Sequence, residues 1–199
     1  MERKEILFNY VADYRYRLLN LFESINLNEF ETLIATIITA FKNGNTLFIA
    51  GNGGSAATAS HMQADFTFFV RYFSKFRPRV ISLTDNIPII TAVGNDTSFD
   101  DIFVEQMRGI FKPGDVLLSI SASGNSKNVI KATEFANEIG GKTLCFVGFH
   151  GGKLKDICNV ALFTPNEKGD YGPIEDIHMI LDHMIVNFFS KDEEFLGLQ

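Results

Sequence analysis

The sequence predicts an α/β fold, in which one parallel β-sheet carries helices on both faces. From residue 46 onward, short apolar runs alternate with longer segments of helical pattern, which is typical of such a fold. The runs are almost continuously apolar, as expected of strands that are buried on both sides. Two of them enter loops rich in glycine or serine that open a helix. In parallel sheets, ligands bind beyond the carboxyl ends of the strands, where both loops would lie.

Composition favours a single domain over residues 1–199. The chain is 46% hydrophobic and 21% charged, which is close to the average for globular proteins and argues against disorder. Its net charge of −6 argues against nucleic acid or an anionic membrane as the main partner. We find no apolar run of about 18–20 residues and no signal-peptide pattern. We therefore expect a cytoplasmic protein in which Cys145 and Cys158 stay reduced.

Residues 1–44 are expected to form two helices ahead of the sheet. Residues 6–24 carry apolar positions at helical spacing. Asn28 is the predicted N-cap of a second helix over residues 29–42, and Asn43-Gly44 would end it. The first helix is rich in aromatic residues for a peripheral element, which favours packing against another subunit. The alternative is that it covers its own sheet.

Residues 45–190 are expected to form the core and a C-terminal helix. Five apolar runs predict strands over residues 46–50, 79–83, 115–120, 143–147 and 160–163. One helix would follow the GNGGS loop at residues 51–55, and another would span residues 127–139 and end at Gly140-Gly141. Pro173 predicts the first turn of the last helix, residues 174–189.

Two loops in this arrangement are suited to bind an anion. In GNGGS, the glycines let backbone N–H groups approach a ligand, and the following helix adds the positive end of its dipole. In the second loop, residues 121–126, three serines surround Gly124. Hydroxyl groups together with free N–H groups form a phosphate nest without any lysine. A single phosphorylated small molecule bound by both loops would explain them.

A dinucleotide is the alternative ligand for the first loop, because Gly51, Gly53 and Ala56 match the pattern G-x-G-x-x-A. That pattern requires an acidic residue about 20 positions later, at the end of the next strand. Asp85 follows a strand, but it lies 34 positions after Gly51. The match to a dinucleotide site is therefore poor.

Histidines and carboxylates gather on two of the predicted helices. His61 and Asp65 are four residues apart, so their side chains share one helix face. His61 would lie about 9 Å beyond Ser55 along that helix, within reach of a sugar whose phosphate sits on the loop. In the last helix, Glu175/His178 and His178/Asp182 are better same-face pairs than Glu175/His183. Spacing alone therefore leaves the ligands open, although two such helices could build a site for a borderline divalent metal.

Several motifs in order resemble the phosphoheptose isomerase family of sugar isomerase (SIS) domain proteins. They are GNGGSAATASH, Asn95-Asp96, SxSGNS followed by Asn128-Val129, Gly151-Gly152-Lys153, and a closing E-x-x-H-x-x-x-x-H. The resemblance implies a flavodoxin-like αβα sandwich with a five-stranded parallel sheet, in a homotetramer with active sites between subunits. It also implies conversion of sedoheptulose 7-phosphate to D-glycero-heptose 7-phosphate with zinc or another divalent metal. The product would feed lipopolysaccharide or capsule synthesis.

The resemblance also assigns roles to individual residues. Asp65 and His183 would be catalytic, with Asp65 moving the proton between C1 and C2. Metal binding is implied for His61, Asp65, Glu175 and His183. Substrate binding is implied for Asn52, Gly53, Gly54, Ser55, Asp96, Ser121, Ala122, Ser123, Ser126, Asp170 and Glu175.

This chain departs from the family pattern at several of these positions. It has Asp65 where the best-known members have Glu, Glu175 where they have Gln, and Ala122 where they have Thr. Arg71 stands two residues later than the arginine expected there. The shorter Asp65 and the added charge of Glu175 suggest a compensated exchange within one branch, and Glu175 could itself serve as the base.

A non-catalytic SIS module is the main alternative function. Such relatives sense a sugar phosphate or bind a protein partner, including a bacterial replication initiator. They tend to lose one of the metal-site histidines, whereas this chain has both His61 and His183. The enzyme is therefore the favoured prediction.

Overall fold

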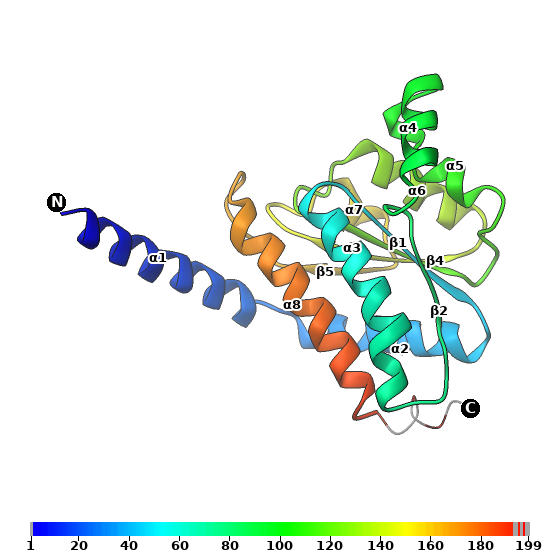
Figure 1. Ribbon diagram of the computed structural model, residues 1–199, viewed down its shortest axis with the longest axis horizontal. Helices are drawn as coiled ribbons and strands as arrows, with labels where there is room; N and C mark the ends of the chain where they lie inside the picture. Colours follow the sequence, from blue (N-terminus) through cyan, green and yellow to red (C-terminus); the bar gives the residue numbers. More distant parts are fainter. Residues whose placement is uncertain (1, 193–194, 196, 198–199) are drawn as a thin grey trace.

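The computed structural model describes residues 2–192, 195 and 197, and its centre is one five-stranded parallel sheet (Figure 1). The strands are β1 (Thr46–Gly51), β2 (Arg79–Ser82), β3 (Val116–Ser121), β4 (Lys142–Val147) and β5 (Val160–Phe163). They lie in the order β2-β1-β3-β4-β5, and every neighbouring pair is parallel. This is the flavodoxin-like order, and it confirms the predicted fold class.

Alternation along the strands divides the apolar side chains between two cores. In β1, Leu47 and Ile49 face α2 (Leu27–Lys42), α3 (Gly54–Ala64) and α8 (Tyr171–Phe189). Phe48 and Ala50 face the other side, with α5 (Val104–Met107), α6 (Lys127–Glu138) and α7 (Gly152–Ile157). Because successive side chains of a strand point to opposite faces, strands this apolar need helices on both faces.

Helix α1 (Arg3–Glu23) projects away from the rest of the molecule (Figure 1). Leu21, near its end, is its buried residue. Eight large apolar side chains along it are 43–67% exposed: Ile6, Leu7, Phe8, Tyr10, Val11, Tyr16, Leu19 and Phe22. Polar contacts join α1 to α8: the Tyr14 hydroxyl donates to Asp176 at 2.5 Å, and Arg17 donates to Asp170 at 2.5 Å.

Several helix ends differ from the predictions. Asn26, rather than Asn28, caps α2, and its side chain accepts from the backbone N–H groups of residues 28 and 29. Helix α8 begins at Tyr171, three residues before the predicted start, so Pro173 is its third residue. Proline is accepted there because the N–H groups of the first turn have no partner within the helix. Three further helices, α4 (Ile87–Asp96), α5 and α7, were not predicted from the sequence.

Helix α3 continues into a π-helical turn, Asp65–Phe69, and then a 3-10 turn, Val70–Tyr72. Phe66 and Val70 are buried in the core below this segment, while Phe68 is exposed. A π-turn accommodates one residue more than an α-turn and is often found at functional sites. Arg71, which stands two residues later than the resemblance leads us to expect, lies in the 3-10 turn.

In the part of the chain that is described, no helix combines the length and apolar character needed to cross a membrane.

Candidate active site

The loops that follow β1 and β3 lie side by side, because these strands are paired. Together with the start of α8 they enclose a pocket of about 250 Å³. The pocket is lined by Asn52, Gly53, Gly54, Ser55, Ile120, Ser121, Ala122, Ser123, Ser126, Tyr171 and Glu175. Nine of these are predicted substrate-binding residues, and Asp96 and Asp170 are the two predicted ones that do not line it.

The first loop depends on the absence of side chains at Gly53 and Gly54. Gly53 has a φ of +55°, which favours glycine. A Cβ on Gly54 would collide with the carboxylate of Glu175. Glu175 therefore lies directly against the loop that opens α3, at the pocket end of both helices.

The second loop is held by its own serines. The Ser121 hydroxyl accepts from the Gly124 N–H at 3.1 Å and lies 3.3 Å from the Ser126 hydroxyl. The Ser123 hydroxyl accepts from the Asn125 N–H at 3.2 Å. Gly124 has a φ of +63°, and a Cβ there would collide with the Gly151 carbonyl. These contacts fix the loop in a shape that presents hydroxyl groups to the pocket.

Tyr171 is a pocket residue that the sequence analysis missed. It is 53% exposed, and its ring makes an edge contact with Phe149 at 5.1 Å between centroids. Phe149 has a φ of +47°, a strained backbone conformation that marks functional sites. Tyr171 was not predicted as a pocket residue because the last helix was expected to start only after Pro173.

Three predicted substrate-binding side chains are occupied by contacts within the protein. Asn52 and Asn128 join their amide groups through two hydrogen bonds of 2.8 and 2.9 Å. Asp96 ends α4, is exposed, and accepts from Asn95 at 2.7 Å. Asp170 precedes α8 and accepts from Arg17. Of the three, only Asn52 lines the pocket.

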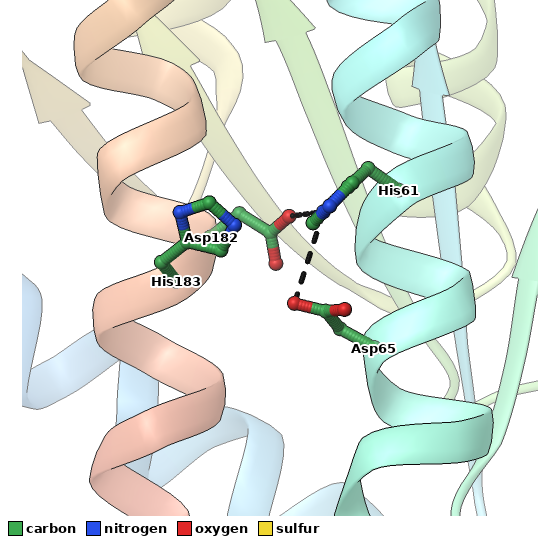
Figure 2. A group of neighbouring side chains, drawn as sticks. All are labelled: His61, Asp65, Asp182 and His183. Atoms are coloured by element: carbon green, nitrogen blue, oxygen red, sulfur yellow. Dashed lines mark hydrogen bonds and ion pairs between the residues drawn. The ribbon is translucent and has the colours of Figure 1, made fainter.

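A second cluster, the His/Asp group, lies between α3 and α8 (Figure 2). It consists of His61, Asp65, Asp182 and His183, whose ligand-type atoms all lie within 4.8 Å of one another. A hydrogen bond of 2.9 Å joins His61 Nδ1 to Asp182 Oδ2, and the same nitrogen lies 3.7 Å from Asp65 Oδ2. The rings of His61 and His183 are 5.0 Å apart.

The group contains three of the four predicted metal ligands, with Asp182 in place of Glu175. Asp182 was named in the sequence only as one half of a same-face pair with His178. The structure favours Asp182 because its side chain contacts His61 of α3. Glu175 lies two turns earlier on α8 and lines the pocket. Spacing on α8 alone could not reveal this, since the choice depends on where α3 crosses it.

Burial changes the acid–base properties of two side chains on α8. Asp182 is fully buried. Burial raises its pKa to about 7, the His61 hydrogen bond opposes this, and the nearby Asp65 charge adds to it. Burial also lowers the pKa of His178 to about 3. Among the described residues, three buried side-chain nitrogen or oxygen atoms lack a hydrogen-bond partner: both ring nitrogens of His178 and Oδ1 of Asp182.

The donor set of the His/Asp group fits a divalent metal. Two imidazoles and two carboxylates suit borderline ions such as zinc. A buried carboxylate oxygen without a partner is costly, and a cation beside it would remove that cost. His61 and His183 are exposed and Asp65 is partly exposed, so a substrate could reach the group from the solvent.

Comparisons with known proteins identify the family. The profile of the SIS domain family matches residues 9–148. The sequence is 36% identical to the phosphoheptose isomerase of Clostridium acetobutylicum over 166 residues, which is 83% of each chain. The chain belongs to the phosphoheptose isomerase family. A family member from Chlorobaculum tepidum is 37% identical over 175 residues, covering 85% of this chain and 82% of the relative.

The fold agrees with this membership. The phosphoheptose isomerase of Neisseria gonorrhoeae superposes with a TM-score of 0.85 at 28% identity, covering 96% of this chain and all of the other. The predicted resemblance is thereby confirmed, as is the prediction of an enzyme that isomerises phosphorylated sugars. Asp85, the candidate ribose ligand of the dinucleotide alternative, instead accepts a hydrogen bond from Ser60 of α3.

Proposed function

We propose that the protein interconverts sedoheptulose 7-phosphate and D-glycero-heptose 7-phosphate, with the help of a divalent metal. The observation that carries the proposal is the placement of two complementary sites on one helix. The glycine loop and pocket lie at the N-terminus of α3. The pair His61/Asp65 follows on the same helix, starting about 9 Å beyond Ser55.

The pocket is suited to the phosphate end of the substrate. It combines serine hydroxyls, a glycine loop and the N-terminus of α3, and all three favour a phosphate group. Phosphate binding at this distance from the reacting carbons supplies binding energy that orients them. The sugar chain would then extend along α3 towards the His/Asp group.

The reaction requires a base and an acid–base partner close together. Starting from the ketose, Asp65 removes a proton from C1 to give the enediolate of the sugar and returns it to C2. His183 moves the hydroxyl proton from O1 to O2, so the atoms balance and no oxidant is needed. A divalent metal such as zinc, when bound by His61, Asp65 and His183, would stabilise the negative charge on the sugar oxygens.

The wider assignments extend the same proposal. The exposed apolar face of α1 supports a homotetramer, and Asp96, which lies away from the pocket of its own chain, would suit a site between subunits. The product would serve the synthesis of lipopolysaccharide or capsule. In the non-catalytic alternative, the His/Asp group would have no catalytic role. The convergence of four ligand-type side chains argues against that alternative.

Isotope exchange tests the function directly. The protein is incubated with sedoheptulose 7-phosphate in deuterated water, alongside a panel of C5–C7 ketose phosphates, and deuterium at C1 and C2 is followed by NMR. We expect uptake with the heptulose. Binding of a sugar without either deuterium uptake or formation of the aldose would favour the non-catalytic alternative instead.

Two substitutions test the assigned roles. Asp65→Asn and His183→Gln should each lower kcat by about 10²–10⁴-fold. Asp156→Asn, at an exposed site on α7 across the sheet, is the matched control and should keep full turnover. If both active-site variants retained wild-type turnover after their metal content was checked, the proposed mechanism would be wrong.

A further inference from the structure

Asp182 combines complete burial with an incomplete set of hydrogen bonds. It is fully buried between α8 and α3. Its Oδ2 contacts His61 Nδ1 at 2.9 Å, while its Oδ1 has no hydrogen-bond partner. A carboxylate with one unpartnered buried oxygen destabilises a fold unless something else occupies that place.

A second carboxylate makes the arrangement still less favourable. Asp65 approaches the same His61 nitrogen, at 3.7 Å, so two acidic side chains converge on one imidazole. The Nδ1 atom of His61 can donate a hydrogen bond to only one of the two carboxylates at a time. A dication could bind both carboxylates, and it would also accept the lone pairs of His61 and His183.

Glu175 is poorly placed to complete this set. It precedes His183 by eight residues on α8, which corresponds to about 12 Å along a helix axis. Its carboxylate instead lies against Gly54 in the pocket, and it is not a member of the His/Asp group. Asp182 is next to His183 in sequence and is a member.

We infer that Asp182 is a direct metal ligand and completes a His₂Asp₂ site with His61, Asp65 and His183. This inference rests on the metal-assisted function proposed above. It assigns the second acidic ligand to Asp182 and leaves Glu175 to the phosphate pocket. Asp65 is one methylene shorter than the glutamate expected by resemblance, and Asp182 supplies a second carboxylate from the opposite helix.

Metal titration separates the two acidic candidates. Zn²⁺ binding to the metal-free protein is measured by calorimetry for the wild type, Asp182→Asn and Glu175→Gln. Both variants replace a carboxylate by an amide of the same shape. Asp182→Asn should weaken Zn²⁺ binding by about 100-fold or more, whereas Glu175→Gln should change it by less than about threefold. The opposite ranking would overturn the inference.

A cysteine variant distinguishes a direct ligand from a residue that only orients His61. In Asp182→Cys, bound Co²⁺ should show a thiolate-to-cobalt charge-transfer band in the near ultraviolet, because the band requires a metal–sulfur bond. Glu175→Cys is the matched control and should bind Co²⁺ without that band. A folded Asp182→Cys protein that binds Co²⁺ without the band would show that residue 182 is not a ligand. This second variant also keeps the test decisive if Asp182→Asn fails to fold.

The outcomes distinguish this inference from the proposed function. If the wild type binds no divalent metal, both the metal-assisted mechanism and the role of Asp182 are wrong. If metal binds through Asp182 but no sugar phosphate is isomerised, the function is wrong and the ligand assignment stands. If isomerase activity is present but the cysteine band appears only at position 175, the ligand assignment alone is wrong.

Discussion

At the scale of single residues, Glu175 and Asp182 show how two carboxylates on one helix acquire different surroundings. Glu175 is partly exposed at the polar pocket, and Asp182 is buried two turns further on. The difference follows from where α3 and its loop contact α8. We therefore expect Asp182 to affect metal binding and Glu175 to affect substrate binding.

Glu175→Gln should strengthen substrate binding. The change removes a negative charge beside the pocket that we assign to the phosphate, so repulsion between the two falls. We expect KM to decrease by about three- to tenfold, as measured in steady-state assays at low ionic strength. Raising the salt concentration should reduce the difference in KM between the variant and the wild type, because salt screens the repulsion. A collapse of kcat with unchanged metal content would instead identify Glu175 as the base.

His178 should make the protein sensitive to acid. Burial lowers its pKa from 6.5 to about 3, so between these pH values only the unfolded chain binds the proton. Stability is therefore complete above about pH 6.5 and falls as the pH is lowered. At pH 5 the loss from this residue is about 2 kcal/mol.

The variant His178→Met tests this sensitivity by chemical denaturation at pH 7, 6 and 5. Methionine fills a similar space without a titrating group, so the free energy of unfolding should depend less steeply on pH. His150→Asn, at an exposed loop position, is the matched control and should keep the wild-type slope. An unchanged slope in His178→Met would contradict the prediction.

At the scale of elements, the strand-to-helix loops carry the strictest steric requirements. Gly124→Ala would place a side chain at a φ of +63° and against the Gly151 carbonyl. We expect a loss of about 3 kcal/mol or more in the free energy of unfolding. Gly109→Ala is the matched control, because a Cβ there would meet no atom within 4 Å. Equal stabilities of the two variants in denaturant titrations would show that the loop can shift to accept a side chain.

The elements that the sequence predicted well are those fixed by local pattern. The five strands were identified because each is a short, mainly apolar run, and the two anion loops because glycine and serine stand at strand ends. Helices α5 and α7 were missed because they have only four and six residues, and α4 because none of its residues is buried in this chain. The start of α8 was misplaced because Pro173 was taken to stand directly before the helix, whereas it is the third helical residue.

The candidate site was predictable only in part, for a related reason. His61 and Asp65 are a local pair on one helix, and the resemblance supplied His183. Asp182 and Tyr171 become site residues only through contacts with α3 and with the Phe149 loop. Such contacts join segments more than 20 residues apart in the sequence, and helical spacing contains no information about them.

At the scale of the whole molecule, α1 is the feature that supports the proposed assembly. Its exposed apolar side chains are spread along most of its length, on a helix that projects from the rest of the molecule (Figure 1). Tyr14 and Arg17 anchor the helix to α8. Burial, together with the hydrogen bond to Asp176, raises the pKa of Tyr14 to about 12, so the hydroxyl stays a donor at neutral pH.

Leu7→Lys combined with Val11→Lys should break the proposed tetramer. Both side chains are 55% exposed. They lie four residues apart and so share one helix face, which means that the double variant places two charges on one apolar surface. Light scattering after size exclusion should show a smaller assembly, with lower activity if the sites lie between subunits. Glu5→Lys combined with Asn9→Lys places two lysines at the same spacing on another face and is the matched control. A wild-type mass for the Leu7/Val11 variant would exclude this face from the interface.

The π-helical turn after Asp65 has a consequence for how the protein can be engineered. An inserted residue in a regular α-helix rotates every following side chain by about 100°, whereas a π-turn such as Asp65–Phe69 accommodates one extra residue locally. His61 and Asp65 lie at or before the start of this turn, and Phe66 and Val70 anchor it to the core. The exposed aromatic side chains Phe68, Phe69 and Tyr72 therefore stand on a segment whose length and composition can be varied while the proposed metal ligands keep their positions.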